Sequence, residues 1–372
     1  MIKFCKVLFL CLIISQYFTP KIYSQKLGVN YNGVFSQINH TDLNRCEALL
    51  IRGFVDYFDF KSGKKNLFTD SGLKKLKEKH SQGFKVIINI KFNYEEKNLP
   101  VTQSETNEEL IFLDTLLNAV YNSCDYLVCG NEPFIESKKD QRDSRLSNFY
   151  ITVAERVKSF ADKQTRKIPL YIGAFDNLWK PSWQTEAAKT LIEFANKTEW
   201  ISGIDLHIHH TYMEDIDSVF QFVTPLIRED QKIIVTEFSL KNFWKLHLKD
   251  TIPLILNTKF GRQKNWEVYQ YLNYTIHNPV SKQEWVEFLS NSNWFEENKN
   301  YLTDAMEKFN SYQKFQMATY GLYQNAPQEF TAKTDPWIIN PLFVNVTVVI
   351  DSLTGEYQTN YKFFEEFVKL VR

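Results

Sequence analysis

The sequence predicts an α/β fold, a (β/α)8 TIM barrel with a long helical and aromatic insertion between strands seven and eight. Two observations support this prediction. Short apolar runs without a polar break, typical of strands buried on both faces, alternate with segments whose apolar residues recur at helical spacing. Strict alternation of this kind gives parallel strands joined by right-handed crossovers, and eight such units close into a barrel.

The first half of the chain contains four expected strand–helix units. A helix is predicted between Thr41, which can cap it, and Gly53, which stops it. The next helix ends at Gly83, and Thr106 with Glu109 has the spacing of a capping box at the start of the third. The strands are expected at 27–31, 54–60, 85–90 and 126–130.

The second half continues the same alternation. Pro133 lacks a backbone N–H, so the chain has to turn directly after the fourth strand. A long amphipathic helix is expected at 144–164, and Thr185 begins the next. Strands follow at 170–174, 204–209, 233–235 and 318–323, and the last helix is expected at 360–371.

The connection after strand seven is the irregular one. Residues 241–313 are longer than the other connections and rich in aromatic side chains. Loops that follow barrel strands line the active face, so this insertion is a candidate wall or lid; a helical subdomain with its own small core is the other interpretation. Its aromatic residues include Trp244, Trp266, Tyr269, Tyr271, Tyr274, Trp285 and Trp294.

Composition excludes one broad class of function. The chain has 44 Lys and Arg and 44 Asp and Glu, which gives a formal net charge of zero. Proteins that bind nucleic acids normally have a basic bias, so a nucleic-acid partner is not expected. The aromatic content of 15% leaves side chains available for stacking on sugar rings as well as for the core.

Residues 1–24 have the three parts of a secretory signal. Lys3 and Lys6 precede an apolar run at 7–14, and a short exit ends at Ser24. The run is too short to span a bilayer, so we expect cleavage and no membrane span afterwards. Residues 25–372 are then expected to form one catalytic domain that is secreted or periplasmic. Three cysteines remain, enough for at most one disulfide.

Two glutamates stand at the ends of buried runs. Glu132 follows the fourth expected strand and Glu237 the seventh. A charged side chain in such a place is costly unless it has a partner or a task, and active sites of parallel α/β folds lie at that end of the strands. A retaining glycoside hydrolase needs two carboxyl groups about 5 Å apart, one as acid/base and one as nucleophile.

The sixth expected strand contributes further polar side chains. If Leu206 and Ile208 face the outer helices, then Asp205, His207 and His209 point into the barrel. Three interpretations remain open. The histidines can belong to a hydrogen-bonded core network, they can orient a glutamate or contact sugar, or His207 and His209 can hold a metal ion.

The chain resembles clan A glycoside hydrolases, which are retaining (β/α)8 enzymes. The resemblance rests on the sequences Asn-Glu-Pro at 131–133, His-Thr-Tyr at 210–212 and Thr-Glu-Phe at 236–238. It implies that Glu132 is the acid/base and Glu237 the nucleophile. It further implies that Asn131 binds the sugar 2-hydroxyl, that Tyr212 steadies the nucleophile, and that His210 lies beside the scissile sugar.

Three more residues are candidate substrate contacts. Asn30 ends the first expected strand, His209 faces the barrel interior, and Trp337 follows the eighth strand closely enough to overhang the site. Several members of the clan have a tryptophan at the end of strand eight. This chain has Tyr320 and Tyr323 there instead, which is a departure at the floor of the substrate pocket.

The function expected from these residues is retaining hydrolysis of β-glycosidic bonds in a poly- or oligosaccharide, with no cofactor. Glu132 has to be protonated to act as the acid, so its pKa is expected to be raised by burial and by Glu237. The alternatives are a non-catalytic carbohydrate-binding barrel and a metal-dependent hydrolase that uses His207 and His209.

Overall fold

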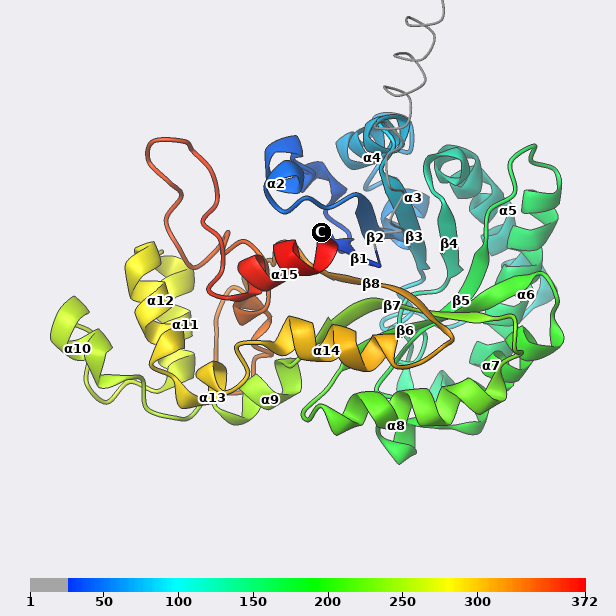
Figure 1. The fold of residues 1–372 in the computed structure, drawn as a ribbon. Helices are drawn as coiled ribbons and strands as arrows, with labels where there is room; N and C mark the ends of the chain where they lie inside the picture. The colour runs from blue at the N-terminus through cyan, green and yellow to red at the C-terminus, as the bar shows by residue number, and fades with distance from the viewer. Residues whose placement is uncertain (1–25) are drawn as a thin grey trace, which may run out of the picture.

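The computed structural model describes residues 26–372, so the expected signal segment at 1–24 lies outside the described residues. Eight parallel strands form a closed barrel in chain order, in which β1 also pairs with β8 (Figure 1). The predicted barrel is confirmed. Its strands are β1 Leu27–Asn30, β2 Leu50–Asp56, β3 Lys85–Lys91, β4 Tyr126–Cys129, β5 Leu170–Asp176, β6 Ile201–His209, β7 Lys232–Ser239 and β8 Phe315–Gly321.

Helices between successive strands cover the outside of the barrel (Figure 1). Thr185 caps α7 as predicted, because its side chain accepts a hydrogen bond from the Ala188 N–H. Among residues 26–372, no helix is long and apolar enough to cross a membrane. The outer helices are α2 His40–Arg45, α4 Ser71–Ser81, α5 Gln103–Val120, α6 Ser144–Asp162, α7 Glu186–Lys197, α8 Glu214–Val223, α14 Tyr301–Asn310 and α15 Phe363–Val371.

The prediction for the second strand was wrong in position. The helix α2 ends at Arg45, and the residues from Leu50 onward already belong to β2, where they pair with β3. Residues 57–60, expected as strand, belong instead to the short helix α3 Tyr57–Lys61. The side chain of Asp56 accepts a hydrogen bond from the Asp59 N–H and thereby caps this helix. This local cap outweighs the β propensity of the aromatic residues that follow it.

The helix α5 begins one turn before the predicted capping box. The Thr102 hydroxyl accepts from the Glu105 N–H at 3.2 Å, and the Glu105 carboxylate accepts from the Thr102 N–H at 2.8 Å. Glu109, which was expected to form the box with Thr106, makes an ion pair of 2.8 Å with Lys61 instead. Both pairs have the spacing of a capping box, so spacing alone does not distinguish them.

The barrel interior has an apolar layer beneath a polar one. Alternate residues of a strand point to the same side, so Leu50 and Arg52 of β2 lie in successive layers. The polar layer is nearer the C-terminal ends of the strands and is hydrogen-bonded; for example, Asn89 donates to Asp205 at 2.7 Å. The site above it therefore rests on a packed interior. The apolar layer consists of Leu50, Ile87, Val128, Tyr171, Ile234 and Met317.

The predicted insertion follows β7 at Lys241. Its last helix, α14, takes the usual place of a barrel helix, because Phe309 packs against Phe220 of α8 and Phe238 of β7. The preceding helices stand to one side of the barrel (Figure 1). They are α9 Lys241–Leu246, α10 Leu254–Phe260, α11 Val268–His277, α12 Lys282–Ser290 and α13 Asn293–Glu296.

The insertion has a packed aromatic interior that is continuous with the core around the barrel. Trp244 and Trp285 are almost completely buried, and Tyr271 and Trp294 pack against Phe288 of α12. Residues 241–313, all of which the structure describes, contribute no side chain to the lining of the central cleft. Of the two interpretations of this segment, the structure therefore supports a helical subdomain over a wall of the cleft, but its core is shared with the barrel.

Candidate active site

A cleft of about 390 Å³ opens at the C-terminal ends of the barrel strands. This is the end of a (β/α)8 barrel at which active sites form. The cleft holds both glutamates singled out in the sequence, together with Asn131, His209 and Trp337. Its other lining residues, which sequence reasoning missed, include Asn32, Phe54, Asp56, Asp59, Lys65, Lys91, Gln324 and Asn325.

A tight turn after β4 positions Glu132. The backbone has a φ of +125° at Gly130 and +41° at Glu132, a conformation that a glutamate rarely adopts. A Cβ atom at Gly130 would lie 2.1 Å from the Gly173 carbonyl oxygen, so only glycine allows β4 and β5 to approach this closely. Strained residues of this kind concentrate at functional sites. The predicted turn at the Asn-Glu-Pro sequence is thus present.

A β-bulge positions Glu237. The pairing between β6 and β7 shifts by one residue, from Leu206 opposite Val235 to His207 opposite Glu237. Without the shift, the alternation of the strand would turn Glu237 away from the interior. With it, Thr236 hydrogen-bonds to Asp205 inside the barrel and Glu237 still reaches the cleft.

Arg52 connects the two sides of the site and is completely buried. Its Nη1 donates to Glu237, and its Nη2 donates to the side-chain oxygen of Asn131 at 2.6 Å. The same guanidinium donates to Asn30 at 3.1 Å and to Asn89 at 2.9 Å. A buried cation needs such partners, and here they fix the nucleophile candidate in one position. Sequence reasoning missed Arg52 because it assigned that segment to the end of a helix, although a lone arginine in an apolar run was a signal.

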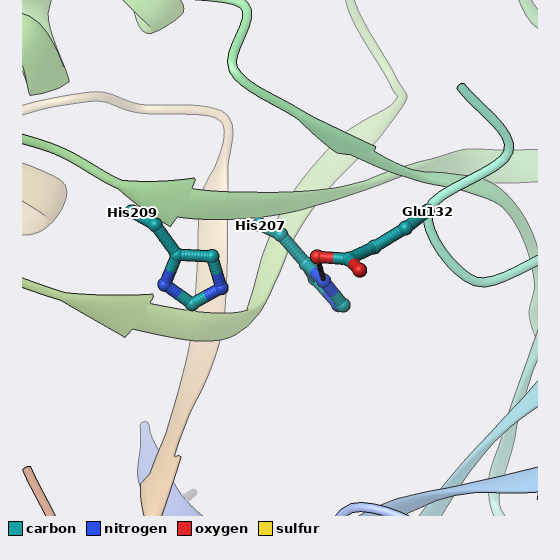
Figure 2. Close-up of side chains that lie close together, drawn as sticks. All are labelled: Glu132, His207 and His209. Atoms are coloured by element: carbon teal, nitrogen blue, oxygen red, sulfur yellow. Dashed lines mark hydrogen bonds and ion pairs between the residues drawn. The ribbon is translucent and has the colours of Figure 1, made fainter. Parts of the chain in front are cut away.

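The histidines of β6 point into the barrel, as the alternation predicted. His207 lies between the glutamates: its Nδ1 is 3.0 Å from Glu132 Oε1, and its Nε2 is 3.8 Å from Glu237 Oε1. His209 Nε2 is 3.6 Å from Glu237 Oε2, and its ring meets the Trp337 ring edge to face at 4.7 Å. Figure 2 shows the Glu132 carboxylate directed at His207, with His209 beside it on the same strand. The network and the glutamate-orienting interpretations therefore both hold.

The charges of the site set its protonation. Burial raises the pKa of Glu237, but the charges of His207 and Arg52 outweigh burial and hold it well below 4.5. Burial also raises the pKa of Glu132, but the hydrogen bond and charge of His207 lower it below 4.5 overall. The pKa of His207 is raised above 6.5, because the two carboxylates outweigh its burial. The expectation of a raised pKa at Glu132 was wrong, since it did not include His207.

The His207 ring lies in a chain of hydrogen bonds that runs from Glu132 to Asp205. Its Nδ1–H donates to Glu132, and its Nε2 lies 3.1 Å from both the Thr236 hydroxyl and Arg52 Nη2. That hydroxyl in turn donates to Asp205 at 2.6 Å. A charged His207 can donate from Nε2 to the Thr236 hydroxyl, whereas a neutral His207 can accept at Nε2 from Arg52. The lowered pKa of Glu132 and the raised pKa of His207 both favour the proton on His207 in the protein without substrate.

The same side chains have the ligand types of a metal site. Ligand atoms of Glu132, His207 and His209 lie within 4.8 Å of one another. However, His207 Nδ1 is hydrogen-bonded directly to Glu132, and Arg52 Nη2 lies 3.1 Å from His207 Nε2. A guanidinium at that distance repels a metal cation. The arrangement therefore fits an ion-pair network better than a metal centre.

Two residues singled out by the resemblance lie elsewhere. His210 is buried between Tyr301, whose hydroxyl is 3.0 Å from its Nε2, and the Tyr212 carbonyl oxygen, to which its Nδ1 donates at 2.7 Å. Burial lowers the pKa of His210 to about 4. Tyr212 is 58% exposed, and neither residue lines the cleft. The strand ends at His209, and Arg52 and His209 occupy the positions around Glu237 that Tyr212 was expected to share.

The remaining predicted residues divide into two groups. Asn131 lines the cleft and donates to Glu136 at 2.7 Å, while its oxygen accepts from Arg52. Trp337 lines the cleft as predicted. Asn30 is buried beneath the cleft and forms hydrogen bonds with Arg52 and Asn32. Asn30 therefore positions residues of the site and does not line the cleft itself.

Solved structures share this barrel. The GH53 catalytic domain from Ignisphaera aggregans matches with a TM-score of 0.52 and 14% identity over 95% of this chain and 98% of that one. A structure of fungal β-1,4-galactanases matches with 0.53 and 11% over 93% and 99%, and xylanase 10B from Thermotoga petrophila with 0.51 and 11% over 93% and 94%. The chain has the fold of clan A glycoside hydrolases.

That likeness concerns the fold, because the identities are low. No model of a protein family and no curated protein sequence matches the chain. The chemistry of the cleft therefore has to be argued from its own residues. In the cleft, the carboxylates of Glu132 and Glu237 are connected through the imidazole of His207. Buried Arg52 fixes Glu237, and the indole ring of Trp337 forms part of the wall.

Proposed function

We propose that the protein is a retaining glycoside hydrolase that cleaves β-glycosidic bonds of a poly- or oligosaccharide by double displacement. The observation that supports this most strongly is the pairing of Glu132 and Glu237 at the ends of β4 and β7, with His207 in contact with both. A binding module needs neither a strained acid at one strand end nor an ionised carboxylate fixed by a buried arginine at the other. The barrel shared with glycoside hydrolases agrees with this interpretation.

In the first step, Glu237 attacks the anomeric carbon. Its low pKa keeps it ionised, and Arg52 and His209 hold it in place. Glu132 gives its proton to the departing glycosidic oxygen, so that the bond breaks without release of an alkoxide. The products are a glycosyl ester of Glu237 and the departing saccharide, whose oxygen now carries the proton as a hydroxyl group.

Before this step, the Glu132 carboxylate has to gain a proton. Transfer from His207 Nδ1 to Glu132 Oε1 along their 3.0 Å hydrogen bond supplies it, and it leaves a neutral imidazole between the carboxylates. In the second step, Glu132 takes a proton from water, which attacks the ester and restores Glu237. Indole and polar side chains of the cleft, including Trp337 and Asn131, are the proposed sugar contacts.

A panel of aryl β-glycosides and neutral polysaccharides tests this function. Glu237→Ala should lower kcat by at least about 10³-fold, because the nucleophile is removed. Glu132→Ala should lose far more activity on phenyl glycosides than on dinitrophenyl glycosides, because only a poor leaving group needs the acid. Near-normal turnover by Glu237→Ala would contradict the proposal.

We also propose export from the cytoplasm, which rests on the sequence pattern of residues 1–24. Mass spectrometry of the protein recovered from the periplasm or the culture medium should find an N-terminus near Gln25. Recovery of the uncleaved chain from the cytoplasm alone would contradict export, and it would leave the chemical proposal untouched.

A further inference from the structure

A second groove, of about 400 Å³, lies on the insertion away from the glutamates. It is bounded by α11 and by the segment at 329–331 of the loop after β8. Its lining combines aromatic rings with amide and carboxylate groups. We call it the insertion groove, and its principal residues are Trp266, Tyr269, Gln270, Asn273, Tyr274 and Glu329.

The aromatic wall of the insertion groove lies at the edge of the hydrophobic core, where its rings are only partly buried. The other tryptophans of the insertion, Trp244, Trp285 and Trp294, are 7% exposed or less and form its interior. Trp266 is only partly buried and lines the groove. An indole that remains open to solvent beside other rings is a binding surface for a ligand with an apolar face.

This wall is held rigidly. The Trp266 and Tyr274 rings are 5.3 Å apart, and Arg262 lies over the Tyr274 ring and donates to its hydroxyl at 2.9 Å. Arg262 is itself fixed by Glu284, to which it donates at 2.6 and 2.8 Å. A platform fixed in advance loses little conformational entropy when a ligand binds.

The polar lining has unused hydrogen-bonding capacity. The Gln270 oxygen accepts from the Glu267 N–H, and the Asn273 oxygen accepts from the Phe330 N–H. Within residues 26–372, neither amide nitrogen donates to a protein acceptor, and the Glu329 carboxylate has no partner. Free donors and acceptors around aromatic rings match the alternating hydroxyl and C–H faces of a sugar. The groove lining contains no lysine or arginine, which disfavours a polyanionic glycan.

One loop connects the groove to the cleft. After β8, Gln324 and Asn325 line the cleft, Glu329 to Thr331 line the insertion groove, and Trp337 returns to the cleft. The bond from the Phe330 N–H to Asn273 fastens this loop to α11. We propose that the insertion groove is a second carbohydrate-binding site, which holds a neutral polysaccharide chain at a distance from the bond that is cleaved.

Binding can be separated from catalysis in a Glu237→Gln background. The protein is made in a bacterial host, because Asn273 opens an Asn-x-Thr sequence and a glycan there would cover the groove. Affinity electrophoresis is run through gels that contain soluble galactan, xylan, mannan or β-glucan. We expect retardation by at least one polysaccharide, and binding at least about tenfold weaker in Trp266→Ala/Tyr269→Ala.

Two further variants test whether the loss of binding is specific to the insertion groove. Phe68→Ala removes an aromatic side chain that is 80% exposed and lines neither the cleft nor the insertion groove, and it should bind like the parent. Gln270→Ala/Glu329→Ala leaves the rings in place and should still weaken binding. Circular dichroism establishes that each variant is folded.

This inference rests on the proposed function only for the class of ligand, a carbohydrate. The test of binding can therefore succeed or fail independently of the test of hydrolysis. With Glu237 restored, the ring variant should keep its kcat on aryl glycosides and show a higher KM on the polysaccharide alone. Unchanged retardation of the ring variant, or no retardation of the parent by any of the four polysaccharides, would overturn the inference. Binding lost in the ring variant of a protein that hydrolyses nothing would uphold it and refute the hydrolase.

Discussion

At the scale of single residues, His207 determines how the site holds its proton. It contacts both glutamates, and its own charge is balanced by them. Sequence reasoning found the two glutamates and the inward histidines from strand alternation. It did not find that His207 reaches Glu132, because that contact depends on the turn after β4. It also placed His210 and Tyr212 in the site by analogy, whereas the end of β6 turns them away.

The pKa of Glu132 tests the role of His207. In the substrate-free protein, the Glu132 carboxyl should titrate below 4.5. In His207→Gln the hydrogen bond from a charged donor is lost, so burial and Glu237 should raise the pKa of Glu132. Carbon-13 NMR of labelled glutamate side chains, assigned with Glu132→Gln, measures both. A pKa for Glu132 that does not change in His207→Gln would contradict this role.

Arg52 should be important for stability as well as for activity. Arg52→Ala leaves the buried Glu237 carboxylate without its cation, so we expect a loss of about 3–5 kcal/mol in the free energy of unfolding. Arg145→Ala is the control, because it removes a surface ion pair with Asp143, each side chain 53% exposed, and should change the free energy of unfolding far less than Arg52→Ala does. Denaturant titration compares the two, and equal losses would refute the assignment.

At the scale of elements, the ends of strands decide where the functional groups lie. Four of the strands, β1, β3, β4 and β5, were located within two residues at both ends, because short apolar runs bounded by turn residues are typical of buried parallel strands. The boundaries of β2 and α5 were missed, since each depends on a cap that competes with an equally good local alternative. The bulge in β7 has no signal in the sequence, yet it aims Glu237 into the cleft.

The turn before Glu132 gives a prediction at this scale. Gly130→Ala places a Cβ against the Gly173 carbonyl at a positive φ, so it should destabilise by about 2–5 kcal/mol. Gly83 also has a positive φ, but an added Cβ there would meet no atom within 4 Å, so Gly83→Ala should cost about 1–2 kcal/mol. Thermal unfolding compares them, and a Gly130→Ala that is no less stable than Gly83→Ala would be inconsistent with the close approach of β4 and β5.

At the scale of the whole molecule, the barrel brings together side chains from distant parts of the chain. The order of eight strand–helix units followed from periodicity, and the extra helices from the length of the seventh connection. The sequence did not predict which tryptophans of that connection are buried and which line a groove, because the two kinds have no distinguishing pattern in the sequence. Only the fold separates Trp285, which packs the insertion core, from Trp266, which lines the groove.

The charged site makes stability depend on pH. Glu237 has a folded pKa below its unfolded value, so its contribution is present above about pH 4.5 and is lost as the pH falls through the folded pKa. Acidification from about pH 5 to about pH 3 should therefore lower the melting temperature more in the natural protein than in Glu237→Gln. Calorimetry across this range measures the difference, and parallel curves would show that Glu237 is not held ionised.

Covalent labelling of the nucleophile is the most direct test of the proposed double displacement. The protein is incubated with a panel of 2-deoxy-2-fluoro β-glycosyl fluorides, which form a glycosyl ester that hydrolyses slowly, and is then digested for mass spectrometry. We expect one sugar to add to the peptide that contains Glu237, and Glu237→Gln to remain unlabelled. An adduct on another residue, or no adduct with any sugar of the panel, would contradict the assignment of Glu237 as the nucleophile.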